Sequence, residues 1–290
     1  MSSAADLPTI ALVTPSRDQA PYLEATLRSV LDQGYPRLRY AVVDGGSRDG
    51  SAAIIARYGE RLAWWVSEPD DGPVEALNKG FAHVEGEVMG WLNSSDLHLP
   101  WTLHTVAAVF RDLPEVEWVL GLQTEADAGG RPFAVHARRW NRYDLLAGDY
   151  RWLQQESVFW RRSLWERAGG RLDPRVRHAC DLALWLRFAD LAPLYHVPLP
   201  LGVYRHHGER RGTAGGRYAA EAAEVWAAWR SRAGARDRRR AALISLLPRR
   251  GRDAWRALLA RSPLPSWYRH PQLVFDHGEG RWRVAGEGGR

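Results

Sequence analysis

The chain contains very little cysteine, lysine or asparagine. Its 290 residues include one cysteine, Cys180, one lysine, Lys79, and three asparagines, at positions 78, 93 and 141. A single cysteine excludes an internal disulfide and any zinc or iron–sulfur site built from several cysteines, which fits a reducing compartment. Lys79 and two of the three asparagines fall inside candidate site motifs.

Long apolar runs are also missing. No stretch of about 18 apolar residues occurs, and no charged-then-apolar leader opens the chain, so neither a membrane-spanning helix nor a secretion signal is predicted. We therefore expect a cytoplasmic protein. With 45% hydrophobic residues, the chain can form one large α/β domain with an ordinary core, followed by a tail.

Acidic residues are scarce in the tail. Between Arg230 and Arg261 there are eleven Arg and two Asp, a local charge of +9, which leaves −3 for the rest of a chain whose net charge is +6. From residue 217 onward the pattern predicts helices. Their apolar members stand at helical spacing among the arginines: Leu243, Leu246, Leu247, Trp255, Leu258 and Leu259.

Three interpretations of this tail stay open. Arginine-rich amphipathic helices suit an anionic membrane surface, which would bring the protein to a lipid-linked acceptor at the inner face of the membrane. Alternatively, Leu243, Leu246, Trp255 and Leu258 pack back on the rest of the chain and leave the arginines in solvent. Nucleic-acid binding has no recognition motif to support it, so we expect no nucleic-acid partner.

Strand-like and helix-like segments alternate from residue 9 to residue 122. Strands are predicted at 9–14, 38–43, 62–66, 86–92 and 118–122, and helices at 21–31, 51–58, 73–83 and 101–111. This order favours a parallel sheet with right-handed crossovers. Beyond residue 122, short strand-like pieces mix with helices at 162–168 and 181–191, which indicates a second half of α+β character.

Polar turns follow three of these strands, at residues 15–18, 44–50 and 93–96. In a parallel sheet the three strand ends emerge on one edge, where open α/β sheets bind ligands. The most informative stretch is Gly90-Trp91-Leu92-Asn93-Ser94-Ser95-Asp96, because it presents one carboxylate among small polar residues after a buried strand. The sequence therefore predicts chemistry at this edge.

The order and spacing of five motifs resemble those of family 2 glycosyltransferases. The motifs are Val13-Thr14-Pro15-Ser16, Val42-Val43-Asp44-Gly45-Gly46-Ser47-Arg48-Asp49-Gly50, Ser67-Glu68-Pro69-Asp70-Asp71-Gly72, Ala76-Leu77-Asn78-Lys79-Gly80 and Trp91-Leu92-Asn93-Ser94-Ser95-Asp96. The resemblance continues through residues 155–162, 181–187 and 204–207, and covers roughly 8 to 210.

This resemblance implies a GT-A fold with a Rossmann-like, mostly parallel sheet flanked by helices. It also implies a nucleotide-diphosphate sugar donor, usually a UDP-sugar, a divalent metal (Mn²⁺ or Mg²⁺), and inversion at the anomeric carbon. We assign residues 1–212 to the catalytic domain, with a donor half at about 8–122 and an acceptor half at about 123–212. Residues 213–290 form a helical, Arg-rich extension.

On the donor side, the resemblance assigns Asp44 to the nucleotide base. It places further donor-binding residues at Pro15, Ser16, Arg17, Glu68, Asp70, Asn78, Lys79, Asn93 and Ser95. Two simpler interpretations remain open. Asp44-Gly45-Gly46 is also the sequence of a plain turn, and Asn78 and Lys79 also suit the end of a helix before Gly80.

The metal motif departs from the family pattern. Two carboxylates usually stand in this turn, whereas here Ser95 replaces one of them and Asp96 remains. Hard cations bind through one carboxylate plus phosphates and water, so Asp96 can suffice. The resemblance adds His207 as a second metal or diphosphate contact. Alternatively, Asp96 caps a helix near residue 100 and His207 is structural.

Asp181 resembles the family's catalytic base at the start of a helix. The helix dipole and free amides there stabilise the ionised carboxylate, although the same physics makes Asp an ordinary cap. Family members often carry an acid just before this Asp, where this chain has Cys180. Gln155, Glu156 and Arg205 are expected on the acceptor side.

We therefore expect an inverting, metal-assisted glycosyltransferase that acts on a glycan or lipid-linked hydroxyl in cell-envelope or polysaccharide synthesis. The alternative is a nucleotide-sugar-binding or scaffolding protein that lost turnover with the carboxylate at position 95. A methyltransferase-like enzyme lacks support, because no Gly-x-Gly turn follows the first strand. The central expectation is that Asp44, Asp96 and Asp181 meet at one pocket.

Overall fold

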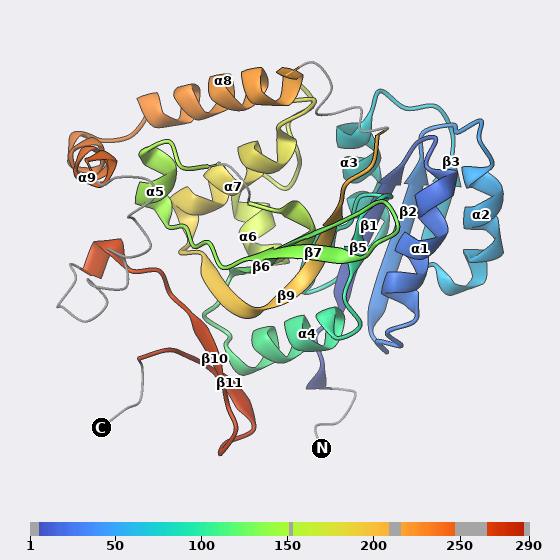
Figure 1. Cartoon of the computed structure of the whole chain (residues 1–290), viewed down its shortest axis with the longest axis horizontal. Coiled ribbons are helices and arrows are strands. Elements are labelled where there is room, and N and C mark those ends of the chain that lie inside the picture. The colour runs from blue at the N-terminus through green and yellow to red at the C-terminus, as the bar shows by residue number, and fades with distance from the viewer. Residues whose placement is uncertain (1–5, 151–152, 209–215, 247–265, 287–290) are drawn as a thin grey trace.

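A nine-stranded sheet organises the chain from residue 10 to residue 205. The computed structural model describes residues 6–150, 153–208, 216–246 and 266–286. The strands lie in the order β3-β2-β1-β4-β8-β6-β9-β5, and β7 pairs with β6 (Figure 1). Helices cover both faces, so the predicted α/β architecture is confirmed.

The first half is a regular alternation of strands and helices. Its elements are β1 (Ile10–Ser16), α1 (Ala20–Leu31), β2 (Leu38–Asp44), α2 (Ser51–Arg57), β3 (Trp64–Ser67), α3 (Pro73–His83), β4 (Val88–Trp91), β5 (Leu97–His98) and α4 (Thr102–Asp112). β2 is parallel to β1 and β3, and β4 is parallel to β1. The predicted boundaries of these strands and helices differ from the observed ones by at most two residues.

The second half mixes parallel and antiparallel pairs. Its elements are β6 (Trp118–Ala126), β7 (Pro132–His136), α5 (Arg142–Leu146), the 3-10 helix η3 (Gln155–Ser157), β8 (Val158–Arg161), α6 (Arg162–Arg167), α7 (Cys180–Leu191) and β9 (Tyr195–Arg205). β8 runs antiparallel to β4 and β6, while β9 is parallel to β6. β9 is one continuous strand of 11 residues.

Successive strand residues point to two separate cores, as the pleat requires. Ile10 and Leu12 of β1 face the core built with α1 and α4, whereas Ala11 and Val13 face the core built with α3 and α7. Burial on both faces explains why the strands of the first half are almost continuously apolar.

A group of aromatic side chains fills the second of these cores. Trp185 of α7 stacks on Trp91 at the end of β4, with ring centroids 5.4 Å apart and planes 11° apart. Trp118 and Trp160 contact the same indole at 6.1 and 5.6 Å. The abundance of tryptophan in this sequence is therefore largely a packing feature.

The C-terminal extension is helical only at first. It forms α8 (Arg217–Ser231), α9 (Ala235–Ser245), a 3-10 helix (Ser266–Tyr268), and then a hairpin of β10 (Leu273–Asp276) and β11 (Arg281–Val284). The prediction of an entirely helical extension is wrong for this hairpin. Leu273 and Trp282 of these strands join the core beside α4, whereas Phe275 is exposed and contacts the Trp282 ring.

The extension shares its cores with the rest of the chain. Ala222 and Trp229 of α8 belong to the same apolar cluster as α7, and the hairpin backbone at Trp282 donates to Asp112 at the end of α4 (2.9 Å). Figure 1 shows α8 lying along α7 at the top and the hairpin below α4. The predicted boundary at residue 212 lies outside the described residues.

The leucines expected to pack back do not all do so. Leu243 and Leu246 are 60% and 80% exposed, while Ala241 and Ile244 form the buried face of α9. Trp255 and Leu258 lie outside the described residues. Across residues 6–150, 153–208, 216–246 and 266–286, no helix combines the length and apolarity that crossing a bilayer requires.

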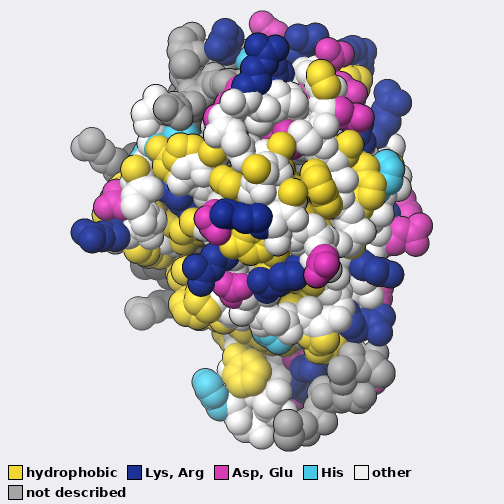
Figure 2. All heavy atoms as spheres, turned by 90° about the vertical axis from the view of Figure 1, so that its right-hand side faces the viewer, with side chains coloured by type: hydrophobic (Ala, Val, Ile, Leu, Met, Phe, Trp, Pro, Cys, Tyr) yellow, Lys and Arg dark blue, Asp and Glu magenta, His cyan; other side chains and the backbone are white. Residues whose placement is uncertain are grey.

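Charges on the first half are largely paired. Figure 2 shows arginine and acidic side chains intermingled on the face that carries α1, α2 and β3. Arg28 pairs with Asp32 at 3.1 Å and Arg57 with Glu24 at 3.0 Å. The surplus of positive charge therefore belongs to the extension, as the residue count indicates.

Gly80 lies inside α3, where a side chain would meet the sheet. An added Cβ would press on both γ-methyl groups of Val13 in β1. We expect Gly80→Ala to lower the free energy of unfolding by about 1–3 kcal/mol, because overpacking a tight core costs about that much. Urea unfolding measures this effect. Gly234→Ala is the matched control, since nothing lies within 4 Å of its added Cβ. Equal stabilities of the two variants would contradict the prediction.

Candidate active site

Asp44 and Asp96 flank the end of β1 at the carboxyl edge of the sheet. Asp44 ends β2 and pairs in register with Ser16, the last residue of β1. On the other side of β1, Val13 pairs with Trp91, and Asp96 lies in the turn that follows. The predicted convergence of these two acids on one edge is therefore observed.

Asp44 is buried and held by neutral donors. Its carboxylate accepts hydrogen bonds from the Ser47 amide (3.0 Å) and hydroxyl, and from the Ser67 hydroxyl (2.7 Å). The turn interpretation is thus correct for its local geometry. The contact between Asp44 and a nucleotide base stays a prediction.

The loops after β1 and β2 brace each other, a feature that sequence reasoning missed. Asp18 has a φ of 51°, and its amide donates to the Ser47 hydroxyl at 2.7 Å. Its carboxylate accepts from the Arg48 amide at 2.9 Å, and Asp49 accepts from the Ala20 amide at the start of α1 (2.8 Å). The signal in the sequence was an Asp in the polar turn after β1, because Asp adopts the left-handed conformation more readily than most residues.

The other residues expected on the donor side differ in burial and in their partners. Pro15 and Ser16 are buried at the end of β1, whereas Arg17 is exposed. Lys79 pairs with Glu68 at 2.7 Å, so its ammonium group lies beside the loop that follows β3. Their contacts with a donor stay predictions.

Asp70 lies against the turn that follows Asp44. A Cβ on Gly45 would come within 2.7 Å of the Asp70 carboxylate, so a larger residue there would force the Asp70 side chain to move. Burial raises the pKa of Asp70 above its usual value. The contact of Asp70 with a donor stays a prediction.

Asn78 has a structural role that the sequence did not reveal. Its amide donates to the Leu172 carbonyl at 3.0 Å and accepts from the Leu172 amide at 2.8 Å. Both polar atoms thus bond the loop before α7, and a contact of Asn78 with a donor stays a prediction. The alternative, a helix that ends before Gly80, is wrong, because α3 continues to His83.

The turn at residues 93–96 is fixed from two sides. Thr26 of α1 donates to the carbonyls of Ser94 (3.0 Å) and Asp96 (2.8 Å). The Arg205 amide of β9 donates to the Asp96 carboxylate at 3.0 Å, and the Asn93 amide lies 3.4 Å from its other oxygen. Ser95 is buried in this turn.

The capping interpretation of Asp96 is wrong. α4 begins at Thr102 after Trp101, and no side chain caps its N-terminus. Asp96 instead lies buried beneath the segment that carries Arg205 and His207.

Asp96 and His207 fit a divalent cation only when other groups, such as phosphate oxygens, complete its coordination. His207 packs on Tyr22 with ring centroids 4.3 Å apart, and the Arg205 guanidinium lies 5.4 Å from the same ring. Among the described residues, no group of three acidic, histidine or cysteine side chains is arranged to hold a metal. One carboxylate and one imidazole suit Mn²⁺ when phosphate oxygens complete the coordination.

Gln155 and Glu156 lie in the 3-10 helix η3, next to the end of β4. Both side chains are buried, and the Gln155 amide donates to the Trp91 carbonyl. This bond satisfies a backbone carbonyl at the end of β4. A contact of these two residues with an acceptor stays a prediction.

Asp181 lies in the first turn of α7. Its Oδ1 accepts from the Leu182 amide at 2.7 Å, and the Tyr218 hydroxyl of α8 lies 3.3 Å from each carboxylate oxygen. Burial is the main cause that raises the pKa of Asp181 to about 6, while these hydrogen bonds act in the opposite direction. The group is thus mostly ionised at neutral pH and close to the range that suits a general base.

The stack of Trp185 on Trp91 connects Asp181 with the sheet edge. Trp185 lies one helical turn after Asp181, and Trp91 lies five residues before Asp96. The rigid pair therefore places the start of α7 beside the end of β4. The expected convergence of Asp44, Asp96 and Asp181 on one pocket stays a prediction.

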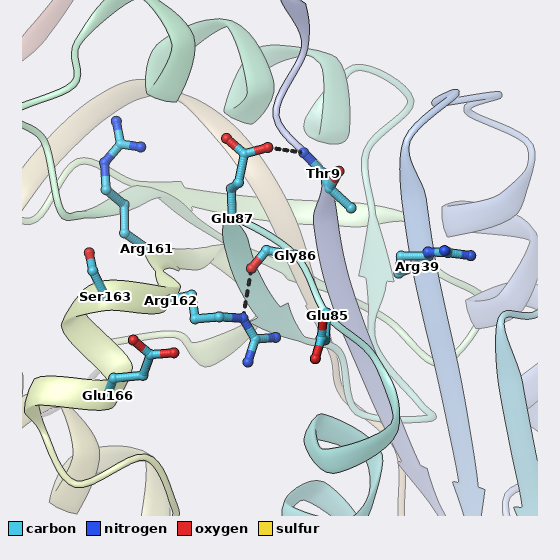
Figure 3. Close-up of a pocket in the computed structure, with 9 residues that line it drawn as sticks. All are labelled: Thr9, Arg39, Glu85, Gly86, Glu87, Arg161, Arg162, Ser163 and Glu166. Atoms are coloured by element: carbon cyan, nitrogen blue, oxygen red, sulfur yellow. Dashed lines mark hydrogen bonds between the residues drawn. The ribbon is translucent and has the colours of Figure 1, made fainter. Parts of the chain in front are cut away.

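The described residues line two cavities. One of about 650 Å³ opens at the amino ends of β1 and β4 and is lined by Thr9, Glu87 and Arg162 among others (Figure 3). Its Arg162 donates to the Gly86 carbonyl at 2.9 Å and is structural. Because the carboxyl edge holds the candidate acids, this cavity is not the reaction site.

The other cavity, of about 130 Å³, lies near the end of β6 and was not foreseen. It is lined by Gln123, Glu125, His136 and Arg138. His136 and His206 each contact the Glu125 carboxylate at 2.7 Å. Burial opposes ionisation of Glu125, but the two histidines outweigh it and lower the pKa.

Solved structures share this fold. Staphylococcus aureus TarS (residues 1–349) in complex with UDP-GlcNAc aligns with a TM-score of 0.66 at 15% identity, over 88% of this chain and 76% of that one. A mannosyltransferase from Pyrobaculum calidifontis, in complex with GDP-Man and Mn²⁺, aligns at 0.51 and 20% identity, over 91% and 84%. The expected GT-A-type architecture is confirmed.

Curated proteins match part of the first half. An uncharacterized glycosyltransferase of Mycobacterium tuberculosis is 38% identical over 90 residues, which is 31% of this chain and 34% of that protein. The putative teichuronic acid biosynthesis glycosyltransferase TuaG of Bacillus subtilis is 34% identical over 92 residues, 31% and 36%. The match spans about a third of the length of these relatives.

The model of the family described as "Glycosyl transferase family 2" matches residues 11–184, well over half of the chain. This region includes the ends of β1, β2 and β4 and stops just beyond Asp181. The protein therefore belongs to glycosyl transferase family 2.

Proposed function

We propose that this protein transfers a sugar from a nucleotide diphosphate, with UDP as the preferred nucleotide, to a hydroxyl acceptor with inversion at the anomeric carbon. TarS, whose fold it shares, binds UDP-GlcNAc. The single observation that carries the proposal is the arrangement of Asp96 and Asp181, joined through the Trp91–Trp185 stack. Transfer by direct displacement needs a base and a site for the leaving diphosphate on one cleft.

Asp181 is the proposed base. Its ionised carboxylate takes the proton of the acceptor hydroxyl while the acceptor oxygen bonds to the anomeric carbon. The bond from that carbon to the diphosphate breaks, and the diphosphate leaves with the electron pair. Attack from the face opposite the leaving group inverts the configuration.

Asp96 and His207 are the proposed contacts for a divalent cation and the diphosphate. A bound Mn²⁺ or Mg²⁺ supplies neutralisation of the charge on the leaving diphosphate. Because Asp96 is the only acid left in this turn, the affinity for the cation alone should be low, and the donor should raise it.

The proposed acceptor is a polymer of the cell envelope or a lipid-linked precursor. The name of the TuaG relative places that protein in teichuronic acid synthesis. In this chain, α9 carries Arg236, Arg239, Leu243 and Leu246 on its outer face. Arginines followed by exposed leucines on one face suit the surface of an anionic membrane.

Asp96→Asn should remove the part of donor binding that depends on Mn²⁺. In the wild type, UDP-GlcNAc with MnCl₂ raises the melting temperature, since ligand at about 100 times its Kd adds about 2.7 kcal/mol. The variant should respond equally with and without MnCl₂. Asp71→Asn, an exposed acid near the same edge, is the matched control. A wild type that responds to no UDP-, GDP- or dTDP-sugar would contradict the proposal.

Asp181→Asn should lower the turnover of the donor by about 10²-fold or more, because a general base contributes about that factor. Release of UDP from the donor measures turnover, and the melting shift with donor should persist. Asp190→Asn, at the other end of α7, is the control. Wild-type turnover in the Asp181 variant would refute the base assignment. Donor binding without turnover in the wild type would favour the alternative of a binding protein.

Reversal of the outer arginines of α9 should weaken binding to anionic vesicles. We expect Arg236→Glu with Arg239→Glu to reduce sedimentation with phosphatidylserine vesicles more than tenfold, since each cation near such a surface contributes about 1 kcal/mol. Neutral phosphatidylcholine vesicles give the baseline. Arg28→Glu with Arg57→Glu, on the opposite half, is the charge-matched control. Equal losses in the two variants would point to net charge rather than to α9.

A further inference from the structure

Two side chains of α8 reach the proposed base from outside the family-matched region. The Tyr218 hydroxyl lies 3.3 Å from both oxygens of Asp181. Tyr218 is partly buried, and its position is fixed by the packing of α8 along α7. A donor shared between two carboxylate oxygens restrains rotation of the group and stabilises its ionised form.

Glu221 holds the backbone that leads into α7. Its Oε1 accepts from the Arg177 amide at 2.9 Å, and its Oε2 accepts from the amides of His178 (2.5 Å) and Ala179 (2.7 Å). The N-terminus of α7 has no side-chain cap of its own. Glu221 therefore fixes the segment that leads into α7, whose first helical residue is Cys180.

We propose that Tyr218 and Glu221 are positioning residues for Asp181, so that the C-terminal extension forms part of the catalytic centre. This inference rests on the proposed role of Asp181 as the base. Tyr218 orients the carboxylate, and Glu221 fixes the three amides before it.

The hydrogen bonds divide the two carboxylate oxygens by role. Oδ1 is occupied by the Leu182 amide at 2.7 Å, which leaves Oδ2 to take the acceptor proton. As Oδ2 gains that proton, the Tyr218 hydroxyl can keep its bond to Oδ1 without moving. The proton therefore has a defined destination.

Three titratable groups in the described residues face or adjoin the Asp181 carboxylate. Tyr218 and Glu221 come from α8, and Cys180 precedes Asp181 in α7, while Tyr150 acts on Tyr218. Tyr218 lowers the pKa of Asp181 through its hydrogen bond, and the negative charge of Glu221 raises it. Removal of the Tyr218 hydroxyl should thus raise the pKa of Asp181, and removal of the Glu221 charge should lower it. A loss of packing alone would not produce shifts of opposite sign.

The test compares Tyr218→Phe with Glu221→Gln. In Tyr218→Phe, the acid limb of the kcat–pH profile should move up by about one pH unit, which is about a tenfold loss of rate at pH values below the limb. In Glu221→Gln the limb should move down. KM for the donor should change little in Tyr218→Phe. Tyr143→Phe is the matched control, because its hydroxyl ties α9 to α5 through Asp237 (3.2 Å).

A carboxyl ¹³C titration of Asp-labelled protein, with Asp181→Asn to assign the signal, gives a readout that needs no turnover. The midpoint should rise in Tyr218→Phe, fall in Glu221→Gln and stay constant in Tyr143→Phe. Unchanged midpoints in the first two variants would overturn the inference. Full activity of Asp181→Asn would instead overturn the assignment of the base, while the titration still reports on Tyr218 and Glu221.

Discussion

The stacked pair of Trp91 and Trp185 determines how the two sides of the candidate site relate. Each large indole removes about 150–250 Å² from water, so the pair and its neighbours dominate the local packing energy. Trp91 leads directly into the turn of Asp96, and Trp185 follows Asp181 by one turn. A rigid core contact, rather than a flexible loop, thereby sets where the base lies relative to the sheet edge.

Arginine has a structural role in this chain that lysine could not fill. Arg161 donates to the carbonyls of Val116, Phe110 and Leu113, and Arg187 donates to those of Ala168 and Arg171. A planar fork with five donors satisfies several carbonyls at once, whereas an ammonium is a single compact charge. Arg161 and Arg187 therefore stabilise the fold. Not all of the forty basic residues are available to bind ligands or to form a charged surface.

The acids at the sheet edge are held mostly by neutral donors. Asp44 is bonded by Ser47 and Ser67, and Asp96 by the Arg205 amide. Backbone amides and hydroxyls keep a carboxylate in place without cancelling its charge, so it can still attract a cation or a proton. The extension follows the same principle, since Tyr218 and Glu221 act on α7 through hydrogen bonds and not through salt bridges.

The sequence alone determined the order of the elements, the sheet edge that carries the polar turns, and the family, because apolar periodicity and motif spacing are local properties. It could not assign Asn78 to Leu172, Gln155 to the Trp91 carbonyl, or Tyr218 to Asp181, since each pair is far apart along the chain. The final hairpin was missed because two short strands give a weak signal that only burial against α4 makes stable. Tertiary structure decides such matters because a buried polar group takes whichever partner the packed chain brings within reach.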